Sequence, residues 1–143
     1  MTPVQVSPSF FISSQIAPED VTALAEQGFV ALINNRPDGE APDQPDSMDI
    51  EAAARAAGLA YLHAPMCGAE ISLADVERIH DLTEQATGKV LGFCRSGARS
   101  MLGWALARSE DLPADELIAL ARGAGHDLSQ WRSVFDARYA AHG

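Results

Sequence analysis

The chain has 143 residues and a mass of 15.2 kDa, and its 47% hydrophobic and 21% charged residues are typical of one soluble globular domain. This composition excludes a disordered, collagen-like or coiled-coil protein. Twenty acidic residues against ten Lys and Arg give a net charge of −10, which disfavours nucleic acid and anionic membranes as partners. The two cysteines have neither a disulfide nor a zinc spacing, and no leader or membrane-spanning run is visible, so we expect a cytoplasmic protein.

Glycine and proline divide the sequence into segments that alternate between helix and strand patterns. End signals and helical spacing predict helices over residues 18–27, 47–57, 72–86 and 100–109, then from 113 and from 127. Short apolar runs predict strands over 29–33, 59–64 and 89–93, and 34–46 has the composition of a loop. Residues 1–143 are therefore expected to form a single α/β domain with a small central, mainly parallel sheet flanked by helices. One face of the last helix, suited to core packing or a dimer contact, carries Leu128, Trp131, Phe135 and Tyr139.

The segment Cys94–Ser100 carries the residues best suited to chemistry, because it joins the third predicted strand to a helix. Gly97 permits a tight turn with inward N–H groups, and the following helix adds partial positive charge. Both features favour a thiolate on Cys94, the form that acts as a nucleophile. Arg99 has a planar fork that matches an oxyanion, and Ser100 can donate a hydrogen bond to the sulfur. The remaining anion-binding positions of the turn are Arg95, Ser96, Gly97 and Ala98. The alternative is a buried core cysteine beside surface arginines.

This segment resembles the Cys-x-x-Gly-x-x-Arg-Ser loop of tyrosine and dual-specificity phosphatases, except that Arg99 follows Cys94 by five positions instead of six. The shorter spacing resembles the loop of single-domain rhodanese sulfurtransferases. Phe93 stands where phosphatases usually have a histidine. Together with the segment 34–40, Asn-Asn-Arg-Pro-Asp-Gly-Glu, the loop resembles the bacterial beta-lactamase hydrolase-like family over residues 10–110. That resemblance implies a protein tyrosine phosphatase-like fold and a phosphatase or sulfurtransferase activity.

A phosphatase of this kind takes its general acid from an Asp in the loop after the second strand, but residues 65–70 contain no Asp. Glu70 and Asp38 are the two candidate substitutes. Arg36 follows the first predicted strand, at the same sheet edge as the cysteine. It either lines the pocket or holds the loop by pairing with Asp38 or Glu40.

Three functions are compatible with these residues. The first is hydrolysis of a small anionic substrate through a covalent intermediate on Cys94, with no cofactor. The second is sulfur transfer through a persulfide on Cys94, and the third is a non-enzymatic module that binds an anion or an acidic partner. Cys67 either exchanges with this thiol or is an inert apolar residue. The four histidines show no metal-ligand spacing, so no metal site is expected, and the oligomeric state stays open.

Overall fold

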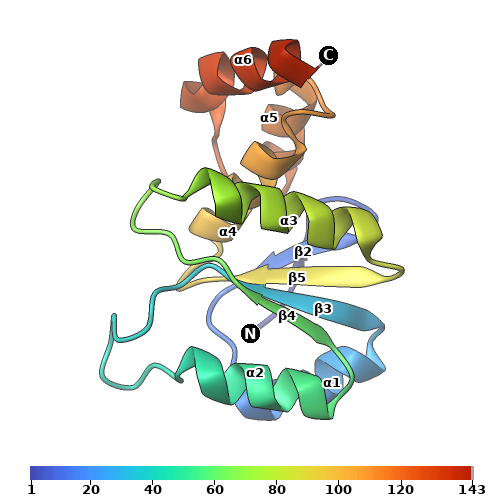
Figure 1. Cartoon of the computed structure of the whole chain (residues 1–143), viewed down its shortest axis with the longest axis vertical. Helices are drawn as coiled ribbons and strands as arrows, with labels where there is room; N and C mark the ends of the chain where they lie inside the picture. Colours follow the sequence, from blue (N-terminus) through green and yellow to red (C-terminus); the bar gives the residue numbers. More distant parts are fainter. Residues whose placement is uncertain (143) are drawn as a thin grey trace.

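A five-stranded sheet lies between layers of helices in the computed structural model, which describes residues 1–142 (Figure 1). The strand order is β1-β2-β5-β3-β4. Their bounds are Val4–Gln5 for β1, Phe10–Ser13 for β2, Phe29–Asn34 for β3, Ala60–His63 for β4 and Lys89–Phe93 for β5. Strands β2, β5, β3 and β4 pair in parallel, and β1 is antiparallel to β2. The mainly parallel sheet expected from the sequence is confirmed.

Helices cover both faces of this sheet. Helices α1 (Val21–Glu26) and α2 (Ser47–Ala56) lie on one face, and α3 (Leu73–Gln85) and α4 (Ala98–Arg108) lie on the other (Figure 1). Helices α5 (Ala114–Gly123) and α6 (Arg132–His142) pack beyond α4, and the 3₁₀ turns η1 (Pro18–Asp20) and η2 (Ser129–Trp131) precede α1 and α6. Each predicted helix is present, although the one expected over 18–27 is divided into η1 and α1.

Apolar side chains fill a core on each side of the sheet. On the α1 and α2 side, Leu24 and Ile50 belong to the same buried cluster as Leu32 and Leu91 of the central strands. The larger core on the other side includes Phe10, Ile33, Val90, Ile79, Met101, Trp104 and Phe135. Because β3 and β5 are covered on both faces, their sequences are continuous apolar runs instead of alternating patterns.

The sequence did not predict β1 or β2, and showed only a short apolar patch at Phe10–Ile12. In the structure β2 pairs along β5, with Phe10 opposite Val90. The ring of Phe10 also stacks on Trp104, with the ring centroids 5.1 Å apart. These partners are far away in the sequence, so a short segment becomes a strand through tertiary contacts that its own pattern does not reveal.

The last helix is shorter than predicted, so it does not carry all four residues of the predicted apolar face. Leu128 and Trp131 precede α6, because the segment after Asp127, whose carboxylate accepts the N–H of Ser129, first forms the 3₁₀ turn η2. Phe135 is completely buried, whereas Tyr139 is 40% exposed. Leu128, Trp131 and Phe135 therefore contribute to the predicted core packing and Tyr139 does not, and the first two do so from the connection between α5 and α6.

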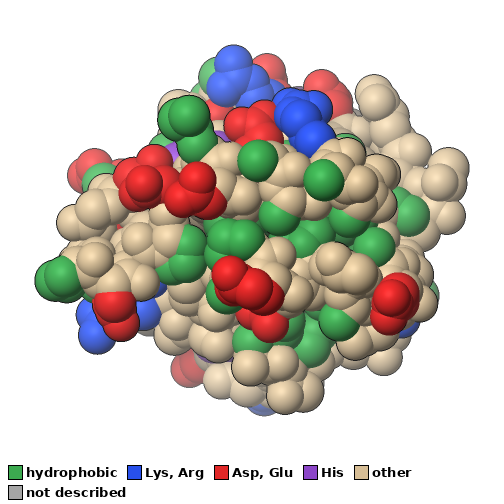
Figure 2. Space-filling model, turned by 90° about the horizontal axis from the view of Figure 1, so that it is seen from below, with side chains coloured by type: hydrophobic (Ala, Val, Ile, Leu, Met, Phe, Trp, Pro, Cys, Tyr) green, Lys and Arg blue, Asp and Glu red, His purple; other side chains and the backbone are tan. Residues whose placement is uncertain are grey.

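Figure 2 shows the face formed by α1 and α2, where acidic side chains surround an apolar strip and basic side chains appear at the margins. The strip between the two helices is lined by small residues, namely Ala25, Ala53, Ala56 and Ala57. This face thus offers no broad cationic surface to a phosphate backbone, in keeping with the net charge of −10. Within residues 1–142, no helix combines the length and the apolar character needed to cross a bilayer.

The loops after β3, β4 and β5 are held together at one edge of the sheet. The N–H of Asn35 donates to the carbonyl of Phe93 at 2.9 Å, and the N–H of Ala64 donates to the carbonyl of Asn34 at 2.9 Å. Met66 continues this pattern by donating to the carbonyl of Asn35 at 3.0 Å. The carboxyl ends of the parallel strands thus form one platform, which is where ligands bind in open α/β sheets.

Candidate active site

Cys94 lies directly after β5 in a turn that α4 closes, and we call residues 94–100 the cysteine loop. Gly97 is the N-cap of α4 and has a φ of 95°. This left-handed backbone conformation is unfavourable for any residue that has a side chain. Its N–H donates a hydrogen bond to Cys94 Sγ at 3.1 Å. The N-terminus of α4 adds the partial positive charge of its unpaired N–H groups. The turn is therefore built to stabilise negative charge on this sulfur.

Cys94 is shielded from solvent within the loop. Cys94 is 1% exposed, and Ser100 beside it is buried with a hydroxyl that has no hydrogen-bond partner within residues 1–142. A Cβ added to Gly92 would lie 3.2 Å from Cβ of Ser100, so the strand beneath the loop has no room for a side chain there. Cys67, the second free thiol, is exposed. Ser100 is thus available to the sulfur or to a group bound to it.

Arg99 is fixed by two acceptors outside the cysteine loop. Its Nη1 donates to Glu40 Oε2 at 2.8 Å and to the carbonyl of Met66 at 2.9 Å, and its Nη2 donates to Glu40 Oε1 at 2.9 Å. No carboxylate or carbonyl oxygen of the described residues accepts from the Nε–H or from the second Nη2–H. The pKa of Arg99 is raised, first by the hydrogen bond with Glu40 and also by the charge of Cys94 and a hydrogen bond with its sulfur. The arginine is therefore oriented in advance, with one edge of two donors that no oxygen acceptor occupies.

Glu40 is the residue of this site that the sequence did not propose as catalytic or substrate-binding. Its carboxylate binds Arg99 through both oxygens and also accepts a hydrogen bond from Arg36 Nε at 2.9 Å. The hydrogen bonds from Arg99 first, and then from Arg36, lower the pKa of Glu40 from 4.5 to about 2. Glu40 is thus ionised at neutral pH and cannot serve as a general acid. The signal that could have found it is the pair of oppositely charged residues four positions apart in the segment 34–40.

Arg36 performs the second of the two roles considered for it, with Glu40 as its partner instead of Asp38. It is 5% exposed, and its Nη1 also donates to Gln15 Oε1 at 3.2 Å. Its backbone carbonyl is hydrogen-bonded to His63 Nε2 at 2.8 Å. A buried cation with these fixed partners holds the loop after β3 against the site and is not free to move toward a substrate.

The loop after β3 has a further anchor on β4. The hydroxyl of Tyr61 accepts a hydrogen bond from Asn34 Nδ2 at 3.0 Å and lies 2.6 Å from Ser47 Oγ. Burial raises the pKa of this phenol, so it stays neutral and available for both contacts. Both ends of residues 34–46 are therefore tied to the sheet.

The two carboxylates considered as general acids have different environments. Asp38 Oδ1 accepts the backbone N–H of Ser47 at 2.8 Å and so anchors the start of α2. Glu70 closes a tight turn with Cys67, in which the two backbones exchange hydrogen bonds of 2.9 and 3.1 Å. Its exposed carboxylate has no hydrogen-bond partner within residues 1–142. Of the two, Glu70 is the carboxylate without a structural task.

The remaining predicted positions of the cysteine loop lie toward solvent. Arg95 and Ser96 are exposed, and Ala98 is exposed at the start of α4. Ser96 Oγ accepts the N–H of Ala98 at 3.4 Å, a contact within the loop itself. The structure thus gathers Cys94–Ser100, Arg36 and Glu40 at one edge of the sheet, whereas Asp38 is engaged with the start of α2.

An open groove of about 460 Å³ adjoins the cysteine loop. Gly68 and Ala69, after β4, form one part of its lining, and the start of α4 contributes Ala98, Arg99 and Leu102. The connection between α5 and α6 supplies the rest, through His126, Asp127, Leu128, Gln130 and Trp131. The groove shares Ala98 and Arg99 with the cysteine loop.

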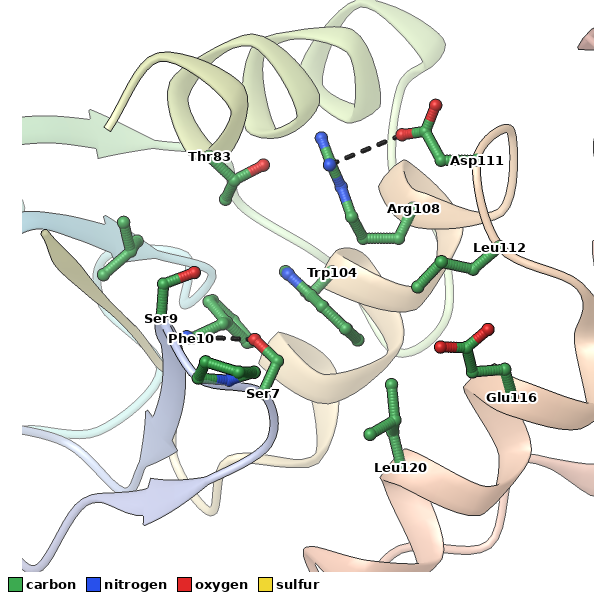
Figure 3. Close-up of a pocket in the computed structure, with 12 residues that line it drawn as sticks. Ser7, Ser9, Phe10, Thr83, Trp104, Arg108, Asp111, Leu112, Glu116 and Leu120 are labelled. Atoms are coloured by element: carbon green, nitrogen blue, oxygen red, sulfur yellow. Dashed lines mark hydrogen bonds and ion pairs between the residues drawn. The ribbon is translucent and has the colours of Figure 1, made fainter. Parts of the chain in front are cut away.

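A second cavity, of about 320 Å³, lies at the opposite edge of the sheet (Figure 3). Figure 3 shows Trp104, Leu120 and the carboxylate of Glu116 around it. Its floor includes Val90 near the beginning of β5, whereas Cys94 follows the end of that strand. This cavity is therefore remote from the thiol and does not belong to the same site.

One cluster could be mistaken for a metal site. His80, Glu84 and Asp111 bring ligand atoms within 4.8 Å of one another. Arg108 Nη1, however, lies 2.9 Å from the carboxylate of Glu84 and 3.4 Å from that of Asp111. Since the guanidinium already supplies the positive charge between these carboxylates, the cluster is an ion-pair network that joins α3 to the end of α4.

Comparison with known proteins identifies the family of this chain. Residues 4–111 match the family described as the beta-lactamase hydrolase-like protein, phosphatase-like domain. A beta-lactamase hydrolase-like protein of Xylella fastidiosa is 36% identical over 129 residues, which are 89% of this chain and 30% of that protein. The chain thus spans about 30% of the length of the curated relatives that it matches.

Solved structures show the same fold. A candidate phosphatase from Neisseria meningitidis has a TM-score of 0.77 and 34% identity, covering 94% of this chain and 96% of that one. PTPMT1, solved in complex with PI(5)P, has a TM-score of 0.73 at 14% identity, covering 98% of this chain and 96% of that one, and shows likeness of fold alone. The tyrosine phosphatase-like fold and the family relationship expected from the sequence are both confirmed. On the strength of the family match over residues 4–111, this chain belongs to the beta-lactamase hydrolase-like family and corresponds to its phosphatase-like domain.

Proposed function

We propose that this chain hydrolyses phosphate monoesters through a covalent intermediate on Cys94. The observation that carries the proposal is the geometry of the cysteine loop, in which Gly97 donates to the sulfur and Arg99 is held with one edge that no oxygen acceptor occupies. A thiolate and an oriented guanidinium at a helix N-terminus suit the attack on phosphorus and the stabilisation of the oxyanion. Membership of a phosphatase-like family supports the same reaction class.

In the first step the Cys94 thiolate attacks phosphorus, so that a sulfur–phosphorus bond forms and the bond to the ester oxygen breaks. The Nε–H and Nη2–H of Arg99, with the backbone N–H groups of the loop, stabilise the charge on the phosphoryl oxygens. The departing oxygen takes up a proton, which we assign to Glu70. Asp38 is engaged with Ser47, and Glu40 is ionised because its pKa is about 2.

In the second step a water molecule attacks phosphorus and the sulfur–phosphorus bond breaks. The carboxylate of Glu70, deprotonated in the first step, accepts the proton of that water. Phosphate leaves and the thiolate of Cys94 is restored, with the Gly97 N–H positioned to stabilise it. The cycle is balanced by the ester and water alone.

The spacing of the cysteine loop favours a second candidate, a sulfurtransferase. With one residue fewer between Cys94 and Arg99 than in phosphatases, the loop has a smaller ring of donors, which suits a sulfur atom better than a phosphoryl group. The Cys94 thiolate would attack the outer sulfur of thiosulfate, the sulfur–sulfur bond would break, and sulfite would leave with the electron pair. An acceptor such as cyanide then attacks the outer sulfur of the persulfide and restores the thiolate. Neither transfer needs a proton donor, so Glu70 has no role in it.

A parallel assay separates the two reactions. Wild type, Cys94→Ser and Cys67→Ser would each be tested for release of phosphate from phenyl phosphate and for transfer of sulfur from thiosulfate to cyanide. The proposal expects ester hydrolysis that Cys94→Ser abolishes and Cys67→Ser retains. Sulfur transfer without ester hydrolysis, together with the mass of one added sulfur atom on Cys94, would replace the phosphatase by the sulfurtransferase.

A further inference from the structure

The groove beside the cysteine loop has no task in the reaction described above. Two of its lining residues, Ala98 and Arg99, are themselves part of the loop. Gly68 and Ala69 follow closely on Met66, whose carbonyl accepts a hydrogen bond from Arg99. The groove is therefore continuous with the place where the reacting group must lie, and whatever is attached to that group is directed into it.

Part of the groove lining is apolar. Leu102 and Leu128 are 5% and 7% exposed, and Trp131 is half-buried against the same core. The volume of about 460 Å³ falls within the range of about 300–1,000 Å³ that is usual for small-molecule sites. An indole and two leucine side chains favour a flat apolar group through burial of its surface.

The charges of the groove oppose a second anionic group. Arg99 is its one Lys or Arg, and two of the donors of that guanidinium already bind Glu40. Asp127 lies on the opposite wall, where the backbone N–H of Ser129 lowers the pKa of the carboxylate and keeps it ionised. Arg36 is buried in its pair with Glu40, and Arg95, which is exposed in the cysteine loop, does not belong to the groove lining. Within the groove lining, a substrate with a further phosphate would therefore meet an ionised carboxylate and no Lys or Arg other than Arg99.

We infer that this groove binds the organic part of the substrate and selects an apolar group without a second phosphate, as in an aryl phosphate monoester. The inference rests on the proposed hydrolysis at Cys94 and adds the substrate class to it. The residues that determine the selection are Trp131, Leu128 and Asp127. This preference contrasts with the phosphorylated inositol lipid PI(5)P bound by PTPMT1, whose likeness to this chain is one of fold.

The kinetic test compares phenyl phosphate with 2-naphthyl phosphate, whose leaving groups are of similar acidity. We expect a kcat/KM for the naphthyl ester about 5- to 20-fold higher in the wild type, because its second ring reaches the apolar part of the lining. Trp131→Ala should lower that ratio to about 1–2, whatever its effect on each ester alone. Tyr139→Ala, which removes an exposed aromatic ring of α6 outside the groove, is the matched control and should leave the ratio unchanged.

Two further variants add bulk or charge without removing packed atoms, so they keep the test valid if Trp131→Ala loosens the core. Ala69→Trp fills the groove and should reduce the naphthyl advantage at least about 5-fold. Gln130→Lys adds the missing cation and should raise kcat/KM for 1,4-phenylene bisphosphate, relative to phenyl phosphate, about 3- to 10-fold. A naphthyl advantage that persists in both Trp131→Ala and Ala69→Trp overturns the inference, as does a wild type that prefers the bisphosphate.

Binding measurements separate a failure of the groove from a failure of the proposed chemistry. If the wild type hydrolyses no ester above the level of Cys94→Ser, the proposed hydrolysis is wrong, and calorimetry with phenylphosphonate and 2-naphthylphosphonate then tests the groove alone. Tighter binding of the naphthyl compound that disappears in Trp131→Ala supports the groove as a ligand site. Equal affinities, or no binding of either compound, refute it.

Discussion

Replacing Glu40 by Gln tests whether the carboxylate between Arg36 and Arg99 holds the site together. The substitution keeps the size of the side chain and removes its charge. It leaves Arg36, 5% exposed, without a counter-charge and removes an ionic partner from both nitrogens of the Arg99 fork. We therefore expect a less stable protein with a more mobile Arg99.

The magnitude follows from the pKa of Glu40. Its fall from 4.5 to about 2 is worth at most about 3.5 kcal/mol, at about 1.4 kcal/mol for each pKa unit. Because the side chain of Glu40 is 31% exposed, solvent screens the pair and about 1–2 kcal/mol is the realistic cost of Glu40→Gln at neutral pH. The same screening applies to the matched control Glu51→Gln, whose partner Arg55 is 65% exposed, and there we expect less than about 0.5 kcal/mol.

The pH dependence gives the sign of the effect. The pKa of Glu40 is lower in the folded state, so its stabilisation is complete above about 4.5 and is lost as the pH falls toward 2. Urea unfolding between pH 7 and pH 3 should show the difference between wild type and Glu40→Gln shrinking by about 1 kcal/mol, while that for Glu51→Gln changes little. Parallel curves for wild type and Glu40→Gln across this range would refute the assignment of a stabilising role to the pair.

Three further substitutions probe the cysteine loop. Gly97→Ala should lower the free energy of unfolding by about 1–2 kcal/mol and reduce kcat/KM at least about 10-fold, because a φ of 95° is unfavourable for alanine. A variant as active as the wild type would contradict this prediction. Gly92→Ala should lower the Tm, since the added Cβ would lie 3.0 Å from the Phe10 ring. An unchanged Tm would show that the strand moves to accommodate the Cβ. Arg99→Lys keeps the charge but not the planar fork, so kcat/KM should fall about 100-fold. We also expect phosphate to raise the Tm of the wild type and not that of Arg99→Lys; equal stabilisation of both by phosphate would place the anion elsewhere.

The strands and helices that the sequence predicted are those whose signals are local. The apolar run over residues 29–33 predicted a strand covered on both faces, and β3 is one. The hydroxyl of Ser72 accepts the N–H of Asp75 and so caps the helix predicted from residue 72. Strand β2 was not predicted, because its four residues are stabilised by contacts with β5 and Trp104, which are far from it in the sequence. Local patterns thus determined the elements with strong end signals but not the pairing at the edge of the sheet.

Some features of the candidate site likewise follow from adjacent residues, and others depend on the fold. The position of Cys94 at a strand end and the turn at Gly97 follow from adjacent residues, and the sequence predicted both features. The role of Glu40 depends on how residues 34–46 return toward the loop, which is a property of the fold. The sequence offered both Asp38 and Glu40 as partners of Arg36, and the structure shows that the partner is Glu40.

The segments 34–40 and 94–100, which together indicated the family, are one physical unit. The N–H of Asn35 bonds the carbonyl of Phe93 just before the cysteine loop, and Glu40 holds Arg99 within it. Since the loop is one residue shorter than that of phosphatases, it has fewer backbone donors to share a bound oxyanion, and the orientation of Arg99 becomes correspondingly more important. That orientation comes from a carboxylate that must stay ionised, so Glu40 cannot also donate a proton, and Asp38 of the same segment is engaged with Ser47. In the proposed hydrolysis the proton is therefore assigned to the loop after β4, where the carboxylate of Glu70 has no hydrogen-bond partner within residues 1–142.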